Sequence, residues 1–121
     1  MMKTFTATAL ALSLAAPALA ADRLEAVADC VPTDAALSYD CTIELSRNGA
    51  PVEDAVFTVA PDMPSMPMAH NIAPVPAEAG DAPGSYTVPL TLDMHGRWAL
   101  RLEVSAPARD MVVVTHDFDA E

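Results

Sequence analysis

The stretch "YTVPLTLDMHGRWALRLEV", residues 86–104, alternates apolar and polar side chains on both sides of a short break. Before the break the apolar positions are Tyr86, Val88, Leu90 and Leu92, and after it they are Trp98, Leu100, Leu102 and Val104. Successive side chains of a strand point to opposite faces, so the pattern predicts two strands that each bury one face. The break itself, "DMHG", ends in Gly96 and is typical of a turn. We therefore expect an antiparallel hairpin here.

The same alternation recurs through the rest of the chain, and no long helical stripe interrupts it. Further strands are predicted in "LEAVADC" (24–30), "LSYDCTIELS" (37–46), "PVEDAVFTVAP" (51–61) and "DMVVVTHDFDA" (110–120). With a methionine-rich segment that follows residue 61, the count reaches about seven short strands, which is typical of an all-β, immunoglobulin-like antiparallel β-sandwich. Pro89 has no N–H to donate, so its strand is expected to form a sheet edge or a bulge there.

Residues 1–20, "MMKTFTATALALSLAAPALA", have the features of a cleaved secretory signal peptide, with Lys3 near the start and small residues before the expected cut. Their apolar run is too short to span a bilayer comfortably, and no later segment has the roughly 20 apolar residues that a membrane helix needs. We expect residues 21–121 to form a single domain without a membrane span after signal cleavage. Because the signal contains no twin-arginine pair, ordinary export to a bacterial periplasm is the expected route.

The sequence argues against two classes of function. Six Lys and Arg residues stand against seventeen Asp and Glu residues, for a formal net charge of −11. Binding to nucleic acid needs clustered Lys and Arg, so no nucleic-acid partner is expected. No arrangement of serine, cysteine or histidine resembles a nucleophile with its base, so the protein is not expected to be an enzyme.

Two cysteines, Cys30 and Cys41, lie on the apolar phases of two consecutive predicted strands. Disulfides persist in exported proteins, and two inward-pointing cysteines on neighbouring strands are expected to pair. A metal site is the competing interpretation, but two cysteines without further ligands at a suitable spacing are a weak metal signal.

The segment "PDMPSMPMAHN", residues 61–71, places three methionines and a histidine between prolines. Met66, Met68 and His70 are spaced by two, so an extended backbone, which the prolines favour, would point all three the same way. Met94 continues the inward phase of the preceding strand, and His95 follows it. Two groups of methionine and histidine thus lie near strand ends, and we expect residues 93–96 to approach residues 63–70.

A neutral thioether is a soft ligand that suits Cu(I), whereas Zn(II) prefers cysteine, histidine and carboxylate. The predicted copper ligands are Met66, Met68, His70 and Met94, with Met63 and His95 as further candidates. Methionine is also a flexible core filler, so packing is the alternative for these residues. Trp98 is a candidate to cap the site, with packing between the sheets as its alternative role. His116 is interpreted as an ordinary strand histidine.

The segments "MPSMPMAHN" and "GSYTVPLTLDMHGRWALRLEV" resemble the YtkA-like family and the related FixH-like proteins. The shared pattern falls on Met63, Met66, Met68, His70, Gly84, Tyr86, Met94, Gly96 and Trp98. The resemblance covers roughly residues 41–105 and implies a small, exported, immunoglobulin-like domain of a kind often found near metal-efflux or cytochrome-oxidase assembly systems. Unlike FixH-like proteins, this chain is expected to keep no membrane anchor.

Two functions are therefore predicted. The first is a periplasmic copper-binding protein, a carrier or buffer that favours Cu(I). The alternative is a metal-free interaction or assembly module whose methionine-rich rim docks on an efflux or cytochrome-oxidase component, because methionine suits adaptable binding surfaces.

Overall fold

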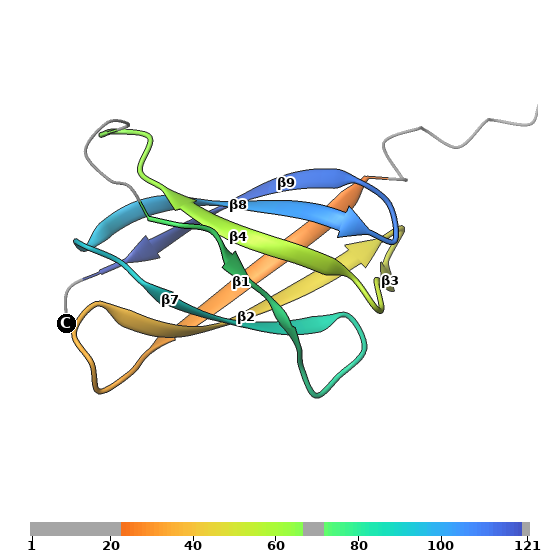
Figure 1. Cartoon of the computed structure of the whole chain (residues 1–121), viewed down its shortest axis with the longest axis horizontal. Helices are drawn as coiled ribbons and strands as arrows, with labels where there is room; N and C mark the ends of the chain where they lie inside the picture. Colours follow the sequence, from red (N-terminus) through yellow and green to blue (C-terminus); the bar gives the residue numbers. More distant parts are fainter. Residues whose placement is uncertain (1–22, 67–71, 120–121) are drawn as a thin grey trace, which may run out of the picture.

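The computed structural model describes residues 23–66 and 72–119, and in this part of the chain every regular element is a β-strand (Figure 1). The strands are β1 (Leu24–Pro32), β2 (Ser38–Arg47), β3 (Ala50–Pro51), β4 (Val56–Asp62), β5 (Val75–Pro76), β6 (Glu78–Ala79), β7 (Ser85–Thr91), β8 (Gly96–Ala106) and β9 (Asp110–Phe118). The described residues contain no helix with the length and hydropathy of a membrane span. Residues 1–20, the predicted signal peptide, lie outside the described part.

The strands form two antiparallel sheets, and these pack face to face as a sandwich, which confirms the predicted fold class. One sheet has the order β1–β2–β7–β6, with β3 also paired to β2, and the other has the order β5–β4–β8–β9. β6 pairs with β7 only at Tyr86 and Thr87, so β7 is a sheet edge at Pro89, as the missing N–H predicts.

The predicted hairpin of residues 86–104 is wrong. Both strands exist, but β7 belongs to the first sheet and β8 to the second, so residues 92–95 form an arch that carries the chain between the two sheets (Figure 1). We call these residues the β7–β8 arch. The period of two specifies which face of each strand is buried, and it says nothing about the neighbouring strand. The apolar faces of β7 and β8 are both buried, because they face each other across the core.

The core consists of the inward phases of the two sheets, as the alternation predicts. The first sheet contributes Leu24, Tyr39, Cys41, Ile43, Leu45, Tyr86, Val88 and Leu90, and the second contributes Phe57, Val59, Trp98, Leu100, Leu102, Val104 and Phe118. Two aromatic pairs cross between the sheets edge to face: Tyr39 with Phe118 at 4.7 Å between ring centroids, and Phe57 with Tyr86 at 5.0 Å. These contacts fix how the two sheets sit on each other.

β1 and β2 form a hairpin in which Cys30 and Cys41 lie directly opposite each other, and the two are joined by a disulfide. The predicted pairing is therefore confirmed. Cys41 is buried, whereas Cys30 is partly buried at the edge of the sheet. A disulfide of this kind indicates an oxidising, extracytoplasmic compartment.

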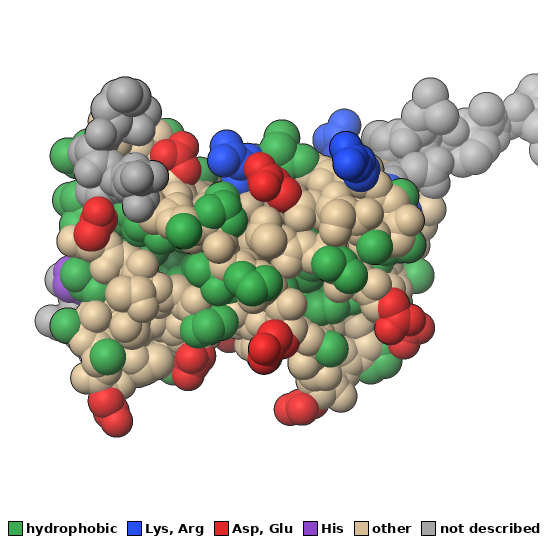
Figure 2. Space-filling model, in the orientation of Figure 1, with side chains coloured by type: hydrophobic (Ala, Val, Ile, Leu, Met, Phe, Trp, Pro, Cys, Tyr) green, Lys and Arg blue, Asp and Glu red, His purple; other side chains and the backbone are tan. Residues whose placement is uncertain are grey.

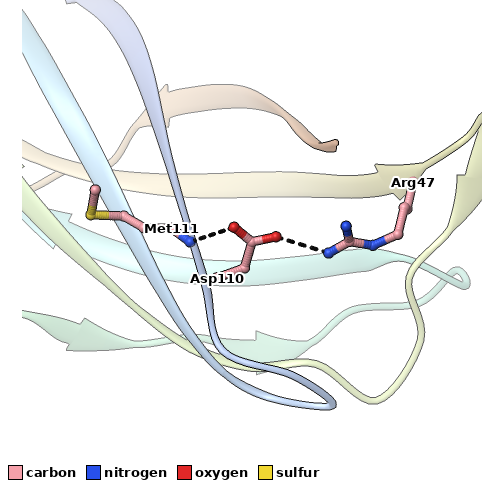
Figure 3. A network of polar contacts seen from close by, with 3 residues as sticks. All are labelled: Arg47, Asp110 and Met111. Atoms are coloured by element: carbon pink, nitrogen blue, oxygen red, sulfur yellow. Dashed lines mark hydrogen bonds and ion pairs between the residues drawn. The ribbon is translucent and has the colours of Figure 1, made fainter. Parts of the chain in front are cut away.

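Charges lie on the surface, and no charged or polar side chain is buried among the described residues. Figure 2 shows Asp and Glu side chains spread over one face, while the Arg side chains visible there gather along the upper edge. One ion pair links the two sheets: Arg47 at the end of β2 donates to Asp110 at the start of β9, with 2.9 Å between Nη2 and Oδ2 (Figure 3). The backbone N–H of Met111 donates to the other carboxylate oxygen of Asp110 at 2.8 Å.

The hydrogen bond from Arg47, aided by the one from Met111, lowers the pKa of Asp110 below its ordinary value. A carboxyl whose pKa is lowered by folding stabilises the fold above its ordinary pKa of about 3.9, and this contribution is lost as the pH falls through the lowered value. We expect Asp110→Asn to lower the free energy of unfolding by about 0.5–1 kcal/mol at pH 7, because both partners are partly exposed. The difference should vanish in strong acid.

Urea unfolding of the parent and of Asp110→Asn across this pH range checks the prediction. Asp117→Asn is the matched control, because the Asp117 carboxylate lies 3.8 Å from Arg97 and both side chains are well exposed. This control should change stability less at every pH. An equal effect of the two substitutions would show that the link between the sheets contributes nothing specific.

Candidate metal site at one end of the sandwich

Met63 joins the methionine-rich segment to the β7–β8 arch. β4 ends at Asp62, which lies opposite Ala99 near the start of β8, so the residue that follows β4 enters the same end of the sandwich. Met63 is only 3% exposed, and its Cε lies 3.2 Å from the position that a Cβ on Gly96 would occupy. The predicted approach of residues 93–96 to the methionine segment is therefore found at Met63 and Gly96.

Gly96 is suited to this contact in two ways. Its φ of 138° lies in the region that side chains disfavour, and the space over its Cα is taken by the methyl group of Met63. A side chain at this position would require the methyl group of Met63 to shift by a few tenths of an ångström. The glycine of the Met-x-Gly element therefore allows the arch to lie close to Met63.

Met66 lies in a turn and not in a strand. Its backbone N–H donates to the carbonyl oxygen of Met63 at 2.9 Å, which closes a four-residue turn with Pro64 in its second position. The predicted extended backbone is thus wrong in the described part of this segment, because the fixed φ of proline also suits the second residue of a turn. The chain leaves the sheet at Asp62, so no neighbouring strand holds Met66 extended.

Met66 and Met94 are exposed, at 43% and 37% of their surface. The expectation that Met94 continues an inward phase is wrong, because β7 ends at Thr91 and the alternation stops with Leu92. Core packing therefore accounts for Met63 but not for these two side chains. Both belong to the segments that Met63 and Gly96 hold together, with Met66 three residues after Met63 and Met94 two residues before Gly96. Met68 and His70 lie outside the described residues.

Trp98 contacts the backbone of the arch from the core of the sandwich. Its side chain is fully buried, and its indole Nε1–H donates to the carbonyl oxygen of Met94 at 3.2 Å. The core role that was the alternative for Trp98 is thus the one observed, and the indole fixes the backbone that carries Met94. On the other side of the arch, the N–H of Leu92 donates to the carbonyl oxygen of Leu37 at 2.9 Å.

His95 follows Met94 on the arch. It is exposed and lines an open groove between the β1–β2 turn and the end of β9, and His116 lines the same groove. The ring of His116 packs on that of Phe118, with 4.6 Å between centroids. Sequence reasoning treated the two histidines separately, because the register that sets Trp98 opposite His116 is not visible in the pattern.

Within the described residues, no three His, Cys, Asp or Glu side chains are placed to hold a metal ion.

The Gly-x-Tyr part of the pattern lies at the opposite end of β7 and is structural. Tyr86 is buried, its hydroxyl donates to the carbonyl oxygen of Val52 at 2.6 Å, and it accepts the N–H of Ala55 at 2.9 Å. Gly84, with φ of 78°, packs its Cα against Pro51. These contacts hold the loop before β4 and do not approach the methionines.

Comparison with known proteins places the chain in a family. The YtkA-like family model matches residues 27–103, which include the arch and the methionine segment. No curated protein and no solved structure matches the chain. Since the family model covers well over half of the sequence, the protein belongs to the YtkA-like family.

Proposed function

We propose that the protein is a periplasmic copper-binding protein, a carrier or buffer and not an enzyme, that binds Cu(I) at the β7–β8 arch. The observation that carries this proposal is the exposure of Met66 and Met94 at one end of the sandwich. Soft thioethers that face solvent are free to bind a soft cation, which buried methionines are not. The disulfide supports the extracytoplasmic location, where thiol ligands tend to be lost.

The proposed ligands are Met66 and Met94, together with Met68 and His70, which follow Met66 in the sequence and lie outside the described residues. His95 follows Met94 on the arch and remains a further candidate. Met63 is not proposed as a ligand in this arrangement, because its side chain is enclosed in the core. Cu(I) needs no carboxylate or cysteine ligand at this site, because two or three thioethers and one imidazole are a suitable set of ligands for it.

The alternative function is a metal-free docking module for an efflux or cytochrome-oxidase assembly component. The same exposed methionines support it, because flexible thioether side chains adapt to a partner surface. The two functions differ in one measurable respect. A copper carrier binds the ion in isolation, whereas a docking module needs its partner.

Anaerobic competition against a Cu(I) chelator tests the proposal. The parent protein should bind one Cu(I), and Met66→Leu/Met94→Leu should bind it about 100-fold more weakly because two soft ligands are gone. Each exchange keeps the apolar volume at a cost usually below about 1.5 kcal/mol, so the variant should stay folded. Zn(II) should bind the parent more weakly than Cu(I).

Met111→Leu is the matched control. Met111 is the most exposed of the described methionines, at 58%, and it lies near the start of β9, at the end of the sandwich away from the arch. This variant should bind Cu(I) like the parent. A parent protein that binds no Cu(I) would remove the copper function and favour the docking module. A double variant that binds as tightly as the parent would show that these two methionines are not the ligands.

A further inference from the structure

The described methionines fall into two classes by exposure. Met63 is 3% exposed, whereas Met66, Met94 and Met111 are 43%, 37% and 58% exposed. Oxidation of methionine by peroxides follows access to the sulfur atom. The thioethers that are available to copper are thus also available to an oxidant, while the methionine that anchors the segment is sheltered.

We propose that Met66 and Met94 are a peroxide-sensitive modification site, and that their oxidation to sulfoxide weakens copper binding at the arch. This inference rests on the proposed copper function. In the reaction, a sulfur lone pair attacks one oxygen of a hydroperoxide and the O–O bond breaks. The sulfur gains an S=O bond and loses two electrons, and the peroxide is reduced to water or an alcohol once the proton has moved to the leaving oxygen.

The product is a poor ligand for Cu(I). Oxidation uses one of the two lone pairs of the sulfur and withdraws electron density from the other, and it presents a hard oxygen to the metal. The chemistry of the site therefore makes copper occupancy and oxidation compete for the same atoms. A bound soft ion shields both sulfurs, and an oxidised site releases the ion.

The fold is built to survive this modification. Sulfoxides disrupt cores when they form on buried methionines, but both sulfurs concerned face solvent. The arch is held by its backbone, through the indole of Trp98 on the carbonyl oxygen of Met94. The anchor at Met63 is enclosed beneath Gly96. Oxidation should thus change the ligands and leave the sandwich folded.

The first measurement is limited hydrogen peroxide treatment of the metal-free protein, followed by tandem mass spectrometry. Met66, Met94 and Met111 should be oxidised about tenfold or more faster than Met63, because rate follows exposure. Circular dichroism should show an unchanged fold. Oxidation of Met63 at the same rate as the other three would overturn the proposed shelter of the anchor.

The second measurement is Cu(I) competition before and after oxidation. Met111→Leu serves as the starting protein here, because it keeps every proposed copper ligand and removes an exposed methionine that lies away from the arch. Its Cu(I) affinity should fall about tenfold or more on oxidation. If the untreated variant binds copper and the oxidised one binds as tightly, this inference is wrong and the copper function stands. If the untreated parent protein binds no copper, both the copper function and this inference fail.

Ag(I) provides a separate readout, because it is a soft ion that does not react with peroxide as Cu(I) does. Ag(I) should slow the oxidation of Met66 and Met94 about tenfold and leave the rate at Met111 unchanged. Equal protection at Met111 would indicate non-specific binding of silver and would count against competition at the arch. The absence of protection at every methionine would also count against competition at the arch.

Discussion

Trp98→Ala is expected to lower the free energy of unfolding by about 3–5 kcal/mol, which is the range for removing a fully buried tryptophan. The indole of Trp98 is 0% exposed and packs between the sheets, so its loss leaves a cavity that neighbouring strands cannot fill. Domains of this size are typically stable by only about 5–15 kcal/mol. The variant should therefore unfold at a much lower urea concentration than the parent, as measured by circular dichroism.

Trp98→Phe separates the two roles of this residue. Phenylalanine retains most of the apolar packing but cannot donate a hydrogen bond to the carbonyl oxygen of Met94, so we expect a loss of about 1–2 kcal/mol. Hydrogen exchange should accelerate more in the β7–β8 arch than in β1 and β2. Wild-type stability of the alanine variant would contradict the central position of Trp98 in the core.

Gly84→Ala is expected to lower the free energy of unfolding by about 2–5 kcal/mol, through backbone strain and overpacking together. A Cβ at this position would lie 2.6 Å from Cβ of Pro51 and 2.9 Å from the carbonyl oxygen of Leu45, both of which are parts of the sheet. The φ of 78° adds the cost of a left-handed conformation. Neither neighbour is a flexible side-chain end that could move aside.

Gly49 offers a matched control for this substitution. Its φ of 77° is nearly the same, but a Cβ there would meet nothing within 4 Å. Gly49→Ala should thus show only the backbone cost of about 1–2 kcal/mol, and the difference between the two variants measures the close approach of Gly84 to Pro51. Thermal or urea unfolding gives both values. Equal losses would mean that β3 moves away from Gly84 without cost.

The alternation of side chains predicted the buried faces correctly, because a strand that covers a core exposes one phase and buries the other. It could not predict which strands are neighbours. Residues 86–104 read as a hairpin, although β7 pairs with β2 and β8 pairs with β4 and β9. Pairing between strands that are distant in sequence depends on how the two sheets pack, and this information is not local.

The candidate site was predicted in its composition and only partly in its geometry. The approach of the arch to the methionine segment followed from placing both near strand ends, and it is seen at Met63 and Gly96. The exposure of Met66 depends on a proline turn that the spacing of two did not reveal. The groove shared by His95 and His116 required the register of β8 and β9.

The hydrogen bond from Trp98 to Met94 has an optical consequence. The sequence contains one tryptophan, so the indole fluorescence of the whole protein comes from a single place, directly beneath the arch. A fully buried indole emits at shorter wavelengths than one in water, and an ion bound near Met94 would change the surroundings of this indole. The chain thus contains its own reporter for binding, and a titration can be followed by emission without a chelator or a label.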